Sequence, residues 1–405
     1  MLHFELIRGF KIFISLENIF DIKTEHDFLA ASLRTFRCQY DNIEVYRKFV
    51  DYLKINPEEV RTLDKIPFLP IEMFKNHQIL DKNVSTDLFF QSSGTTQMNL
   101  SKHFIADENI YKESIYRSFE QFIGKPEDFI FLGLLPSYLE KQNSSLIYMV
   151  DFLMKKSGKS ENGYFLYNHE DLFKLLNDLK DKKVILFGVS FALLDFLDFL
   201  HSNAQTLKFS NALTIIETGG MKGRKEEMTK DELLKIFKKG FGTERIFSEY
   251  SMTELLSQAY SLGENIYETP NWMRVLIRNA EDPFSYVEDG RNGAINIIDL
   301  ANRHSCSFIA TQDLGRIINN PEILRDAQND KNDFEVPRFA RNDDNDLFLE
   351  LENARNDKEK FGFEDESVKM LRETQHDKTP IQTKRFQVLG RIDHSDIRGC
   401  SLLVS

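Results

Sequence analysis

Residues 90–103 read Phe-Gln-Ser-Ser-Gly-Thr-Thr-Gln-Met-Asn-Leu-Ser-Lys-His. Gly94 allows the backbone to turn sharply and to approach a ligand closely. Successive backbone N–H groups in such a turn form a nest for anions, and hydroxyl side chains add further donors. Lys102 contributes a mobile positive charge. These features predict a loop that holds a triphosphate, in which the hydroxyls around Gly94 are those of Ser92, Ser93, Thr95 and Thr96.

The spacing of this stretch excludes a Walker phosphate loop. That motif reads G-x-x-x-x-G-K-[ST], whereas this stretch has one glycine and its lysine follows eight residues later. An ordinary Ser/Thr-rich surface turn is the alternative interpretation, because such turns are common. The stretch alone leaves both interpretations open, so the rest of the chain has to decide between them.

Strand and helix patterns alternate after this loop. Short apolar runs predict strands at residues 88–90, 128–136, 184–188, 212–216 and 246–247. Helical patterns follow at residues 191–200, with Ser190 as the expected cap, and at 228–239, with Thr229 as the expected cap. This alternation predicts an α/β fold with a parallel or mixed sheet. Two further strands, at residues 293–300 and 307–310, are expected to form a second β region.

Composition divides the chain into four parts. Residues 1–65 repeat apolar positions at helical spacing, which predicts a helical N-terminal cap. Residues 66–318 form the predicted core. Residues 319–384 hold 17 acidic residues against 11 basic ones and show weak periodicity, which predicts a disordered acidic insertion, with an acidic docking arm as the alternative. Residues 385–405 are expected to form an ordered, hinge-like segment and a C-terminal tail.

The overall composition of the 405-residue chain limits its functions. A net charge of −12 argues against nucleic acid or an anionic membrane as the main partner. The scattered cysteines Cys38, Cys306 and Cys400 suit a reducing cytoplasm rather than a zinc site or a disulfide framework, and Cys38 is expected to be buried. The N-terminus lacks the pattern of a signal peptide. The most apolar stretch, residues 183–200, contains two aspartates and is too polar to span a membrane.

Further candidate ligands lie just after predicted strands, where α/β proteins place their sites. Gly219 and Gly220 allow a flat base to lie close, although a simple tight turn explains them equally well. Glu249 and Glu254 flank a hydroxyl-rich turn, and a carboxylate that faces a triphosphate usually does so through Mg²⁺. A solvated glutamate at a helix start is the alternative for this turn. Asp313, just past a strand and near a glycine, is either a ribose ligand or a turn residue.

Taken in order, these turns resemble the motifs of adenylate-forming enzymes, the acyl-CoA synthetase and luciferase superfamily. The motifs are Ser92–Thr96 with Lys102, Gly219-Gly220, Tyr250–Glu254, Thr311–Gly315 and Gly390–Asp393. Within that superfamily the chain is similar to the acyl-protein synthetases of bacterial bioluminescence, the LuxE family, along nearly its whole length apart from residues 319–384. The pieces that look closest are residues 66–74, 134–138, 250–258 and 390–400.

This resemblance implies the fold of the N-terminal domain of adenylate-forming enzymes, with mixed sheets and flanking helices, lacking most of the usual C-terminal domain. It implies a fatty-acid–protein ligase that forms an acyl-adenylate from ATP and a fatty acid, with Mg²⁺ as the metal. The acyl group then passes to Cys400, which matches the near-terminal cysteine that this family acylates. A LuxC-like acyl reductase is the implied protein partner that receives the acyl group.

The resemblance also implies a role for each matching residue. The β- and γ-phosphates would be held by Ser92–Thr96 and Lys102, and the adenine would be flanked by Gly219 and Gly220. The adenylate would lie near Tyr250 and Thr253, and Mg²⁺ would be held by Glu254. The ribose would be bound by Asp313 and Arg391.

Departures from the superfamily pattern keep other functions open. Gln97 and Ser251 stand where the superfamily usually has glycine, and the acidic insertion separates Asp313 from Arg391. The first alternative is an adenylating ligase whose acceptor is CoA or another carrier. The second is a non-catalytic, degenerate relative. Replacing Cys400 separates the self-acylating enzyme from the first alternative, because only that enzyme would lose transfer while keeping adenylation.

Overall fold

The computed structural model of the chain describes residues 19–92, 100–135, 143–207, 213–219, 228–318, 379–381 and 384–391. The chain divides into two compact units, the first made of residues 1–23, 27–319 and 381–405 and the second of residues 24–26 and 320–380. In the second unit, Thr24 and Pro380 form an antiparallel bridge. The sheet and the candidate site belong to the first unit. The four-part division expected from composition stays a prediction.

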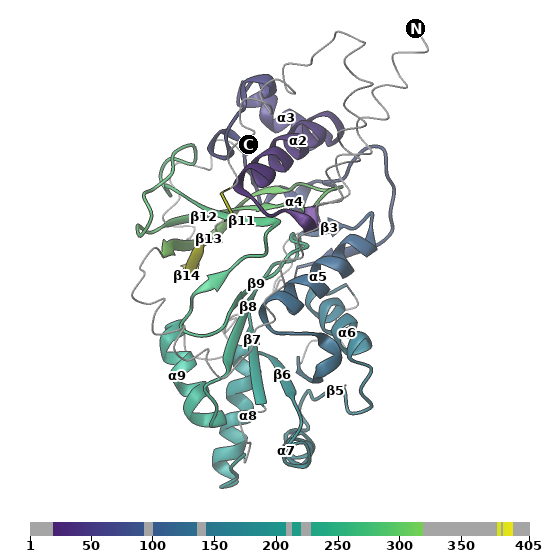
Figure 1. Cartoon of the computed structure of the whole chain (residues 1–405), viewed down its shortest axis with the longest axis vertical. Helices are drawn as coiled ribbons and strands as arrows, with labels where there is room; N and C mark the ends of the chain where they lie inside the picture. Colours follow the sequence, from purple (N-terminus) through teal and green to yellow (C-terminus); the bar gives the residue numbers. More distant parts are fainter. Residues whose placement is uncertain are drawn as a thin grey trace, which may run out of the picture. The chain divides into compact units, whose positions relative to one another are not determined.

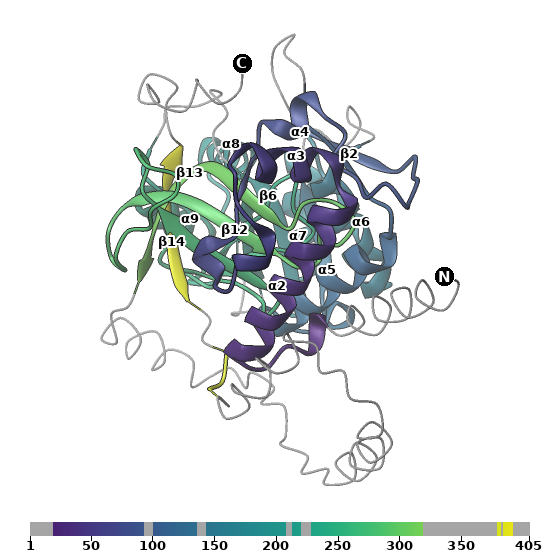
Figure 2. The same cartoon turned by 90° about the horizontal axis from the view of Figure 1, so that it is seen from above.

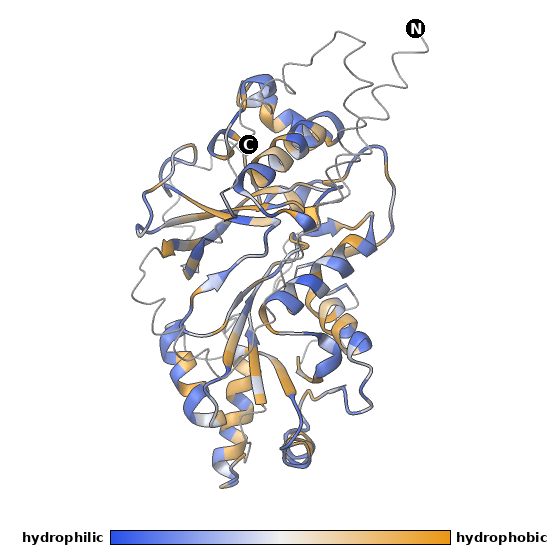
Figure 3. Cartoon of the chain, in the orientation of Figure 1, coloured by the Kyte–Doolittle hydropathy of each residue, from blue (hydrophilic) through white to orange (hydrophobic). Residues whose placement is uncertain are grey.

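Parallel strands form one half of a twelve-stranded sheet in the first unit. In space they follow the order β5 (Gly163–Tyr164), β4 (Ile130–Leu134), β6 (Val184–Val189), β7 (Leu213–Thr218) and β8 (Ile246–Tyr250). Every residue of β4, β6 and β7 is buried, which explains why these strands read as continuous apolar runs rather than as alternating ones. In Figure 3, β6 and β7 are accordingly mainly orange.

Helices connect these parallel strands. They are α6 (Ser145–Ser157), α7 (His169–Asp178), α8 (Ser190–Ser202) and α9 (Lys230–Phe241), and α5 (Glu108–Phe122) precedes β4. Figure 1 shows α5 and α6 on one side of the strands and α8 and α9 on the other. For the connecting helices α6, α8 and α9, this is the arrangement that right-handed crossovers require. The expected cap Thr229 is confirmed, because it forms a reciprocal capping box with Glu232 at the start of α9.

The other half of the sheet is mainly antiparallel. Its strands follow β8 in the spatial order β9 (Ala259–Ser261), β10 (Tyr267–Glu268), β14 (Arg385–Arg391), β13 (Phe308–Ile318), β12 (Gly293–Asp299) and β11 (Met273–Arg278). The two strands expected after the parallel region are therefore present as β12 and β13, and they belong to the same sheet, which they join through β14 (yellow in Figure 2). The short β1 (Leu69–Pro70) pairs with β13 in parallel.

A separate two-stranded sheet carries the ends of the hydroxyl-rich loop. Its strands are β2 (Phe89–Gln91) and β3 (Lys102–Phe104), and they pair antiparallel, with Gln91 opposite Lys102. Residues 93–99 of the loop lie outside the described part of the chain. Because β2 ends and β3 begins at neighbouring positions, the sheet holds the two ends of the loop together.

Most of the remaining helices lie early in the chain, and two of them, α2 (Glu25–Asn42) and α3 (Glu44–Tyr52), pack against β13. The others are the short α4 (Met73–Asn76) and the single 3₁₀ turns η1 (Ile19–Asp21), η2 (Pro57–Glu59), η3 (Leu63–Lys65) and, further along the chain, η4 (Pro126–Asp128). Phe36 and Tyr46 pack their rings against Phe308 at centroid distances of 6.3 and 6.1 Å. This aromatic contact anchors α2 and α3 to the strand that carries Asp313.

Candidate functional site

The candidate site lies at the carboxyl edge of the parallel strands. The chain runs from β4 outward to β5 and then returns to β6 on the other side of β4, so the strand order reverses between β4 and β6. Ligands of open α/β sheets bind at the carboxyl ends of strands near such a reversal. Gly219 directly follows β7, Tyr250 ends β8, and the turn that carries Thr253 and Glu254 comes next.

Tyr250, Asp313 and Arg391 come together although the sequence separates them widely. The Tyr250 hydroxyl donates to Asp313 Oδ2 over 2.8 Å, and Arg391 Nε donates to Asp313 Oδ1 over 3.2 Å. Asp313 and Arg391 lie directly opposite each other in the β13–β14 pair. Asp313 therefore lies inside a strand, not just past one as the sequence suggested. Its carboxylate keeps lone pairs that can accept further hydrogen bonds.

Glu254 is a buried carboxylate next to the base of the hydroxyl-rich loop. Glu254 is 5% exposed, and no helix begins at this position. The alternative interpretation, a solvated glutamate at a helix start, is therefore excluded. Burial raises the pKa of Glu254, while a hydrogen bond from Ser101 and the charges of Arg391 and Lys75 oppose the rise. A cation at this carboxylate would favour its ionised form.

The ends of the hydroxyl-rich loop are joined to each other. The Ser101 N–H donates to Ser92 Oγ over 3.1 Å, and the Ser92 N–H donates to the Ser101 carbonyl over 3.1 Å. Lys102 is exposed, with its Nζ 5.2 Å from the centre of the Phe89 ring. Ser101 thus closes the base of the loop with Ser92, whereas the predicted ligands Ser93, Gly94, Thr95 and Thr96 lie outside the described residues.

Gly219 has a positive φ of 74°, a conformation that favours glycine. Its carbonyl accepts a hydrogen bond of 3.1 Å from the Ser190 hydroxyl, which also donates to Glu217. Ser190 therefore does not cap α8 with its side chain, as the sequence suggested, because its hydroxyl is used by these two acceptors. Lys230 forms an ion pair with the same Glu217. Gly220 and Cys400, two other predicted site residues, lie outside the described part of the chain.

Glu249 is a second buried carboxylate at this edge. Thr218 donates to its Oε2 over 2.5 Å, whereas Oε1 has no hydrogen-bond partner among the described residues. Burial raises the pKa of Glu249, and the hydroxyls of Ser251 and Thr218 oppose the rise. In the sequence, Glu249 stands at the end of an apolar strand, which marks it as a candidate ligand. The sequence alone does not show whether Glu249 or Glu254 faces a ligand.

The donor set suits magnesium better than a transition metal. The described residues contain no group of three or more His, Cys, Asp or Glu side chains that could hold a metal ion. Mg²⁺ needs no such cage, since it keeps several waters and binds through one or two carboxylates together with substrate phosphates. Glu254, a single carboxylate beside a candidate phosphate loop, fits this pattern.

Neither described cysteine is a reactive thiol. Burial raises the pKa of Cys306 to about 12, and its thiol donates to the Phe308 carbonyl over 3.3 Å. Cys38 is only half-buried, so the expectation of a buried thiol was wrong, although burial still raises its pKa. Both groups remain protonated at neutral pH and are poor nucleophiles. None of the helices in the described ranges is long and apolar enough to cross a bilayer.

Because of His103, we expect the free energy of unfolding to decrease as the pH becomes acidic. Its ring is 1% exposed, and burial lowers its pKa from 6.5 to about 4, although a hydrogen bond to Thr253 opposes this. Because the unfolded chain takes up the proton first, stability is complete above pH 6.5 and is lost as the pH falls towards 4. We expect a loss of up to about 3 kcal/mol across this window.

Urea unfolding of the wild type and of His103→Asn at pH 7 and pH 5 checks this pH prediction. The wild type should lose more stability than the variant between the two pH values. Equal losses in the two proteins would show that His103 does not cause the pH dependence.

Comparison with known proteins shows the fold. The open conformation of 2-hydroxyisobutyryl-CoA ligase, in complex with 2-HIB-AMP and CoA, matches with a TM-score of 0.55 and 10% identity over 74% of this chain and 67% of that chain. Its thioesterification state matches with a TM-score of 0.53 and 12% identity over 73% and 64%. ATP-bound MatB from Rhodopseudomonas palustris reaches a TM-score of 0.42 at 14% identity, over 56% and 45%.

This chain spans about two thirds of the length of the 2-hydroxyisobutyryl-CoA ligase structures, and at 10–12% identity the similarity is one of fold. No protein-family model and no curated protein matches the sequence. The two 2-hydroxyisobutyryl-CoA ligase structures confirm the fold class expected from the motifs: this chain has the mixed α/β fold of adenylate-forming enzymes.

Proposed function

We propose that this protein is an ATP-dependent ligase that activates a carboxylic acid as an acyl-adenylate. The observation that carries the proposal is the contact between the strand that closes the hydroxyl-rich loop and the turn of the buried Glu254, where His103 Nδ1 lies 2.9 Å from the Thr253 carbonyl oxygen. Candidate groups for phosphate and for Mg²⁺ are therefore neighbours. The shared fold with a ligase crystallised with 2-HIB-AMP and CoA supports the same class of reaction.

Different residues would bind the phosphates and the Mg²⁺ during adenylation. Attack by a carboxylate on the α-phosphate of ATP brings two anions together, so fixed positive charge lowers the barrier. Lys102 and the loop that begins at Ser92 would hold the β- and γ-phosphates. Glu254 would hold Mg²⁺, which supplies charge neutralisation when bound.

The nucleoside would lie against the neighbouring strands. Asp313 would accept hydrogen bonds from the ribose hydroxyls, and the Tyr250 hydroxyl holds its carboxylate in place. The Arg391 side chain is 79% exposed, so a nucleotide can reach its guanidinium. Gly219 and Gly220 would lie beside the adenine, since neither carries a side chain that would keep a flat base away.

The acid and its acceptor follow from the resemblance to the LuxE family. The acid would be a fatty acid, and the acceptor would be the Cys400 thiol in a cytoplasmic protein that passes the acyl group to a partner reductase. The Cys400 thiolate attacks the acyl carbonyl carbon, a C–S bond forms, the C–O bond to AMP breaks, and AMP leaves with the electron pair. The thiol proton goes to solvent. A thiolate suits this step because it is strongly nucleophilic.

CoA is the second candidate acceptor, because the similar ligase was crystallised with CoA. Intact-mass spectrometry after incubation with ATP, Mg²⁺ and a panel of fatty acids distinguishes the two acceptors. A gain of one acyl mass that hydroxylamine removes and that Cys400→Ser lacks supports self-acylation. Acid-dependent release of pyrophosphate without any gain in mass would contradict self-acylation and favour an external acceptor such as CoA.

A further inference from the structure

A cavity of about 10 Å³ lies between residues 103–110, Leu256 and the loop 301–305. This volume is about what one water molecule requires. Four side chains that line the cavity carry a buried polar atom without a hydrogen-bond partner among the described residues. Three belong to buried residues and are His103 Nε2, Asn302 Oδ1 and Ser305 Oγ, and the fourth, His304 Nδ1, lies 4.0 Å from Asp81 Oδ2. Buried polar atoms without partners cost free energy, so the cavity favours a hydrogen-bonding occupant.

The hydrogen bonding of His103 fixes the role of its cavity-side nitrogen. His103 Nδ1 lies 2.9 Å from the Thr253 carbonyl oxygen. A carbonyl only accepts, so Nδ1 carries the proton of the neutral ring and Nε2 keeps a lone pair. His103 therefore holds the backbone at Thr253 with one nitrogen and offers an acceptor with the other.

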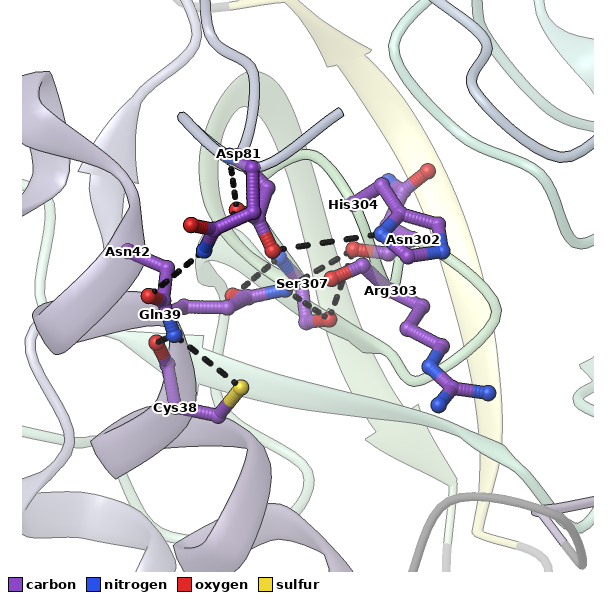
Figure 4. Close-up of polar contacts among 9 residues, drawn as sticks. Cys38, Gln39, Asn42, Asp81, Asn302, Arg303, His304 and Ser307 are labelled. Atoms are coloured by element: carbon purple, nitrogen blue, oxygen red, sulfur yellow. Dashed lines mark hydrogen bonds and ion pairs between the residues drawn. The ribbon is translucent and has the colours of Figure 1, made fainter. Parts of the chain in front are cut away.

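Asn302 is oriented in the same way. Its Nδ2 donates to the Glu254 carbonyl over 2.7 Å and to the Cys306 carbonyl over 3.3 Å, which leaves Oδ1 as an acceptor. Its own carbonyl accepts from Gln39 Nε2 over 2.8 Å, and Gln39 also contacts Ser307 on the same loop, as Figure 4 shows. Helix α2 thus anchors the loop that holds Glu254, a connection that the apolar pattern of this helix did not reveal.

We propose that one water molecule in this cavity joins His103, Asn302 and Ser305 into a unit that positions the Thr253–Glu254 turn. Such a water donates to His103 Nε2 and Asn302 Oδ1 and accepts from the Ser305 hydroxyl, so a single molecule satisfies all three atoms. The inference rests on the proposed adenylation, for which it makes His103 and Asn302 positioning residues.

Because His103 lies on β3 next to Lys102, the group of His103, Asn302 and Ser305 can affect the proposed reaction. Neighbouring residues of a strand point to opposite faces, so Lys102 is exposed while His103 is buried. His103 consequently ties the strand that carries Lys102 to the turn that carries Glu254. Loss of this tie would let the proposed phosphate-binding and Mg²⁺-binding groups move apart, and small displacements of such groups are costly in rate.

Two variants of His103 separate positioning from packing. His103→Asn keeps an N–H donor where Nδ1 lies, whereas His103→Leu fills the space and donates nothing. We expect His103→Leu to lower kcat/KM for MgATP in pyrophosphate release by about tenfold with KM for the acid unchanged, and His103→Asn to recover most of the loss. If the side chain only fills space, the leucine variant keeps more activity than the asparagine variant, and this order overturns the proposal.

A spectroscopic readout keeps the inference testable without turnover. In the full-length protein labelled with ¹⁵N at histidine, and assigned with His103→Asn, the His103 ring should show a protonated Nδ1 and a hydrogen-bonded, unprotonated Nε2. Ser305→Ala should shift the Nε2 resonance. A protonated Nε2 overturns the inference, whatever the activity. A wild type that releases no pyrophosphate with any acid overturns the proposed function instead.

Discussion

Replacing Glu254 by glutamine should lower acid-dependent pyrophosphate release by on the order of 10²–10³-fold, the range seen when one group that stabilises transition-state charge is removed. Glutamine preserves the shape of the side chain and can still accept a hydrogen bond from Ser101, but it carries no negative charge for Mg²⁺. The change also removes a buried carboxylate whose pKa is raised by burial, so the fold should not be weakened.

The measurement for Glu254→Gln is the Mg²⁺ dependence of the initial rate. The variant should need more Mg²⁺ to reach half its maximal rate, and its maximal rate should remain low. Glu281→Gln, which changes an exposed glutamate, is the matched control and should behave as the wild type. Unchanged Mg²⁺ dependence in Glu254→Gln would show that Glu254 does not bind Mg²⁺, and Glu249 would then be the next candidate.

Replacing Asp299 by alanine should destabilise the protein by about 3–5 kcal/mol, because each buried donor left without an acceptor costs on the order of 1–3 kcal/mol. Asp299 is fully buried, and its carboxylate accepts from the N–H groups of Leu256, Ser257 and Ala301 and from the Ser257 hydroxyl. Alanine would leave these donors buried without an acceptor. Since two of the N–H groups closely follow Glu254, the change should also weaken adenylation.

Urea unfolding at pH 7 measures the effect of Asp299→Ala as a lower midpoint with an unchanged slope. Asp178→Ala, at the exposed end of α7, is the matched control and should change stability by less than about 0.5 kcal/mol. A loss below about 1 kcal/mol in Asp299→Ala would show that neighbouring groups or water replace the carboxylate as acceptor.

The sequence predicted the parts of this site that depend on local pattern. The strands β4, β6 and β7 and the Thr229 cap could be recognised from a few consecutive residues. Strands buried on both faces give continuous apolar runs, and a capping box has a short sequence pattern. The motif order also led to Tyr250, Asp313 and Arg391. Their mutual contacts could not be predicted, because they depend on β14 lying between β10 and β13, a pairing that no local pattern encodes.

Single polar residues were harder to interpret. His103 and Asn302 each hold a backbone carbonyl of the Thr253–Glu254 turn, yet neither belongs to a repeated pattern or a recognised motif. Ser190 was interpreted from its position before a helix, where capping is the common role, but the buried Glu217 takes its hydroxyl. In these cases, partners distant in sequence decide the role of a side chain that local reasoning assigns to a cap or a core.

The most direct test of the central claim is exchange of labelled pyrophosphate into ATP, with Mg²⁺ and a panel of carboxylic acids. An acyl-adenylate intermediate predicts exchange that requires both the acid and Mg²⁺, that persists in Cys400→Ser, and that is strongly reduced in Glu254→Gln. Exchange with no acid in the panel, under conditions where the protein is folded, would contradict the account and favour a non-catalytic relative of adenylate-forming enzymes.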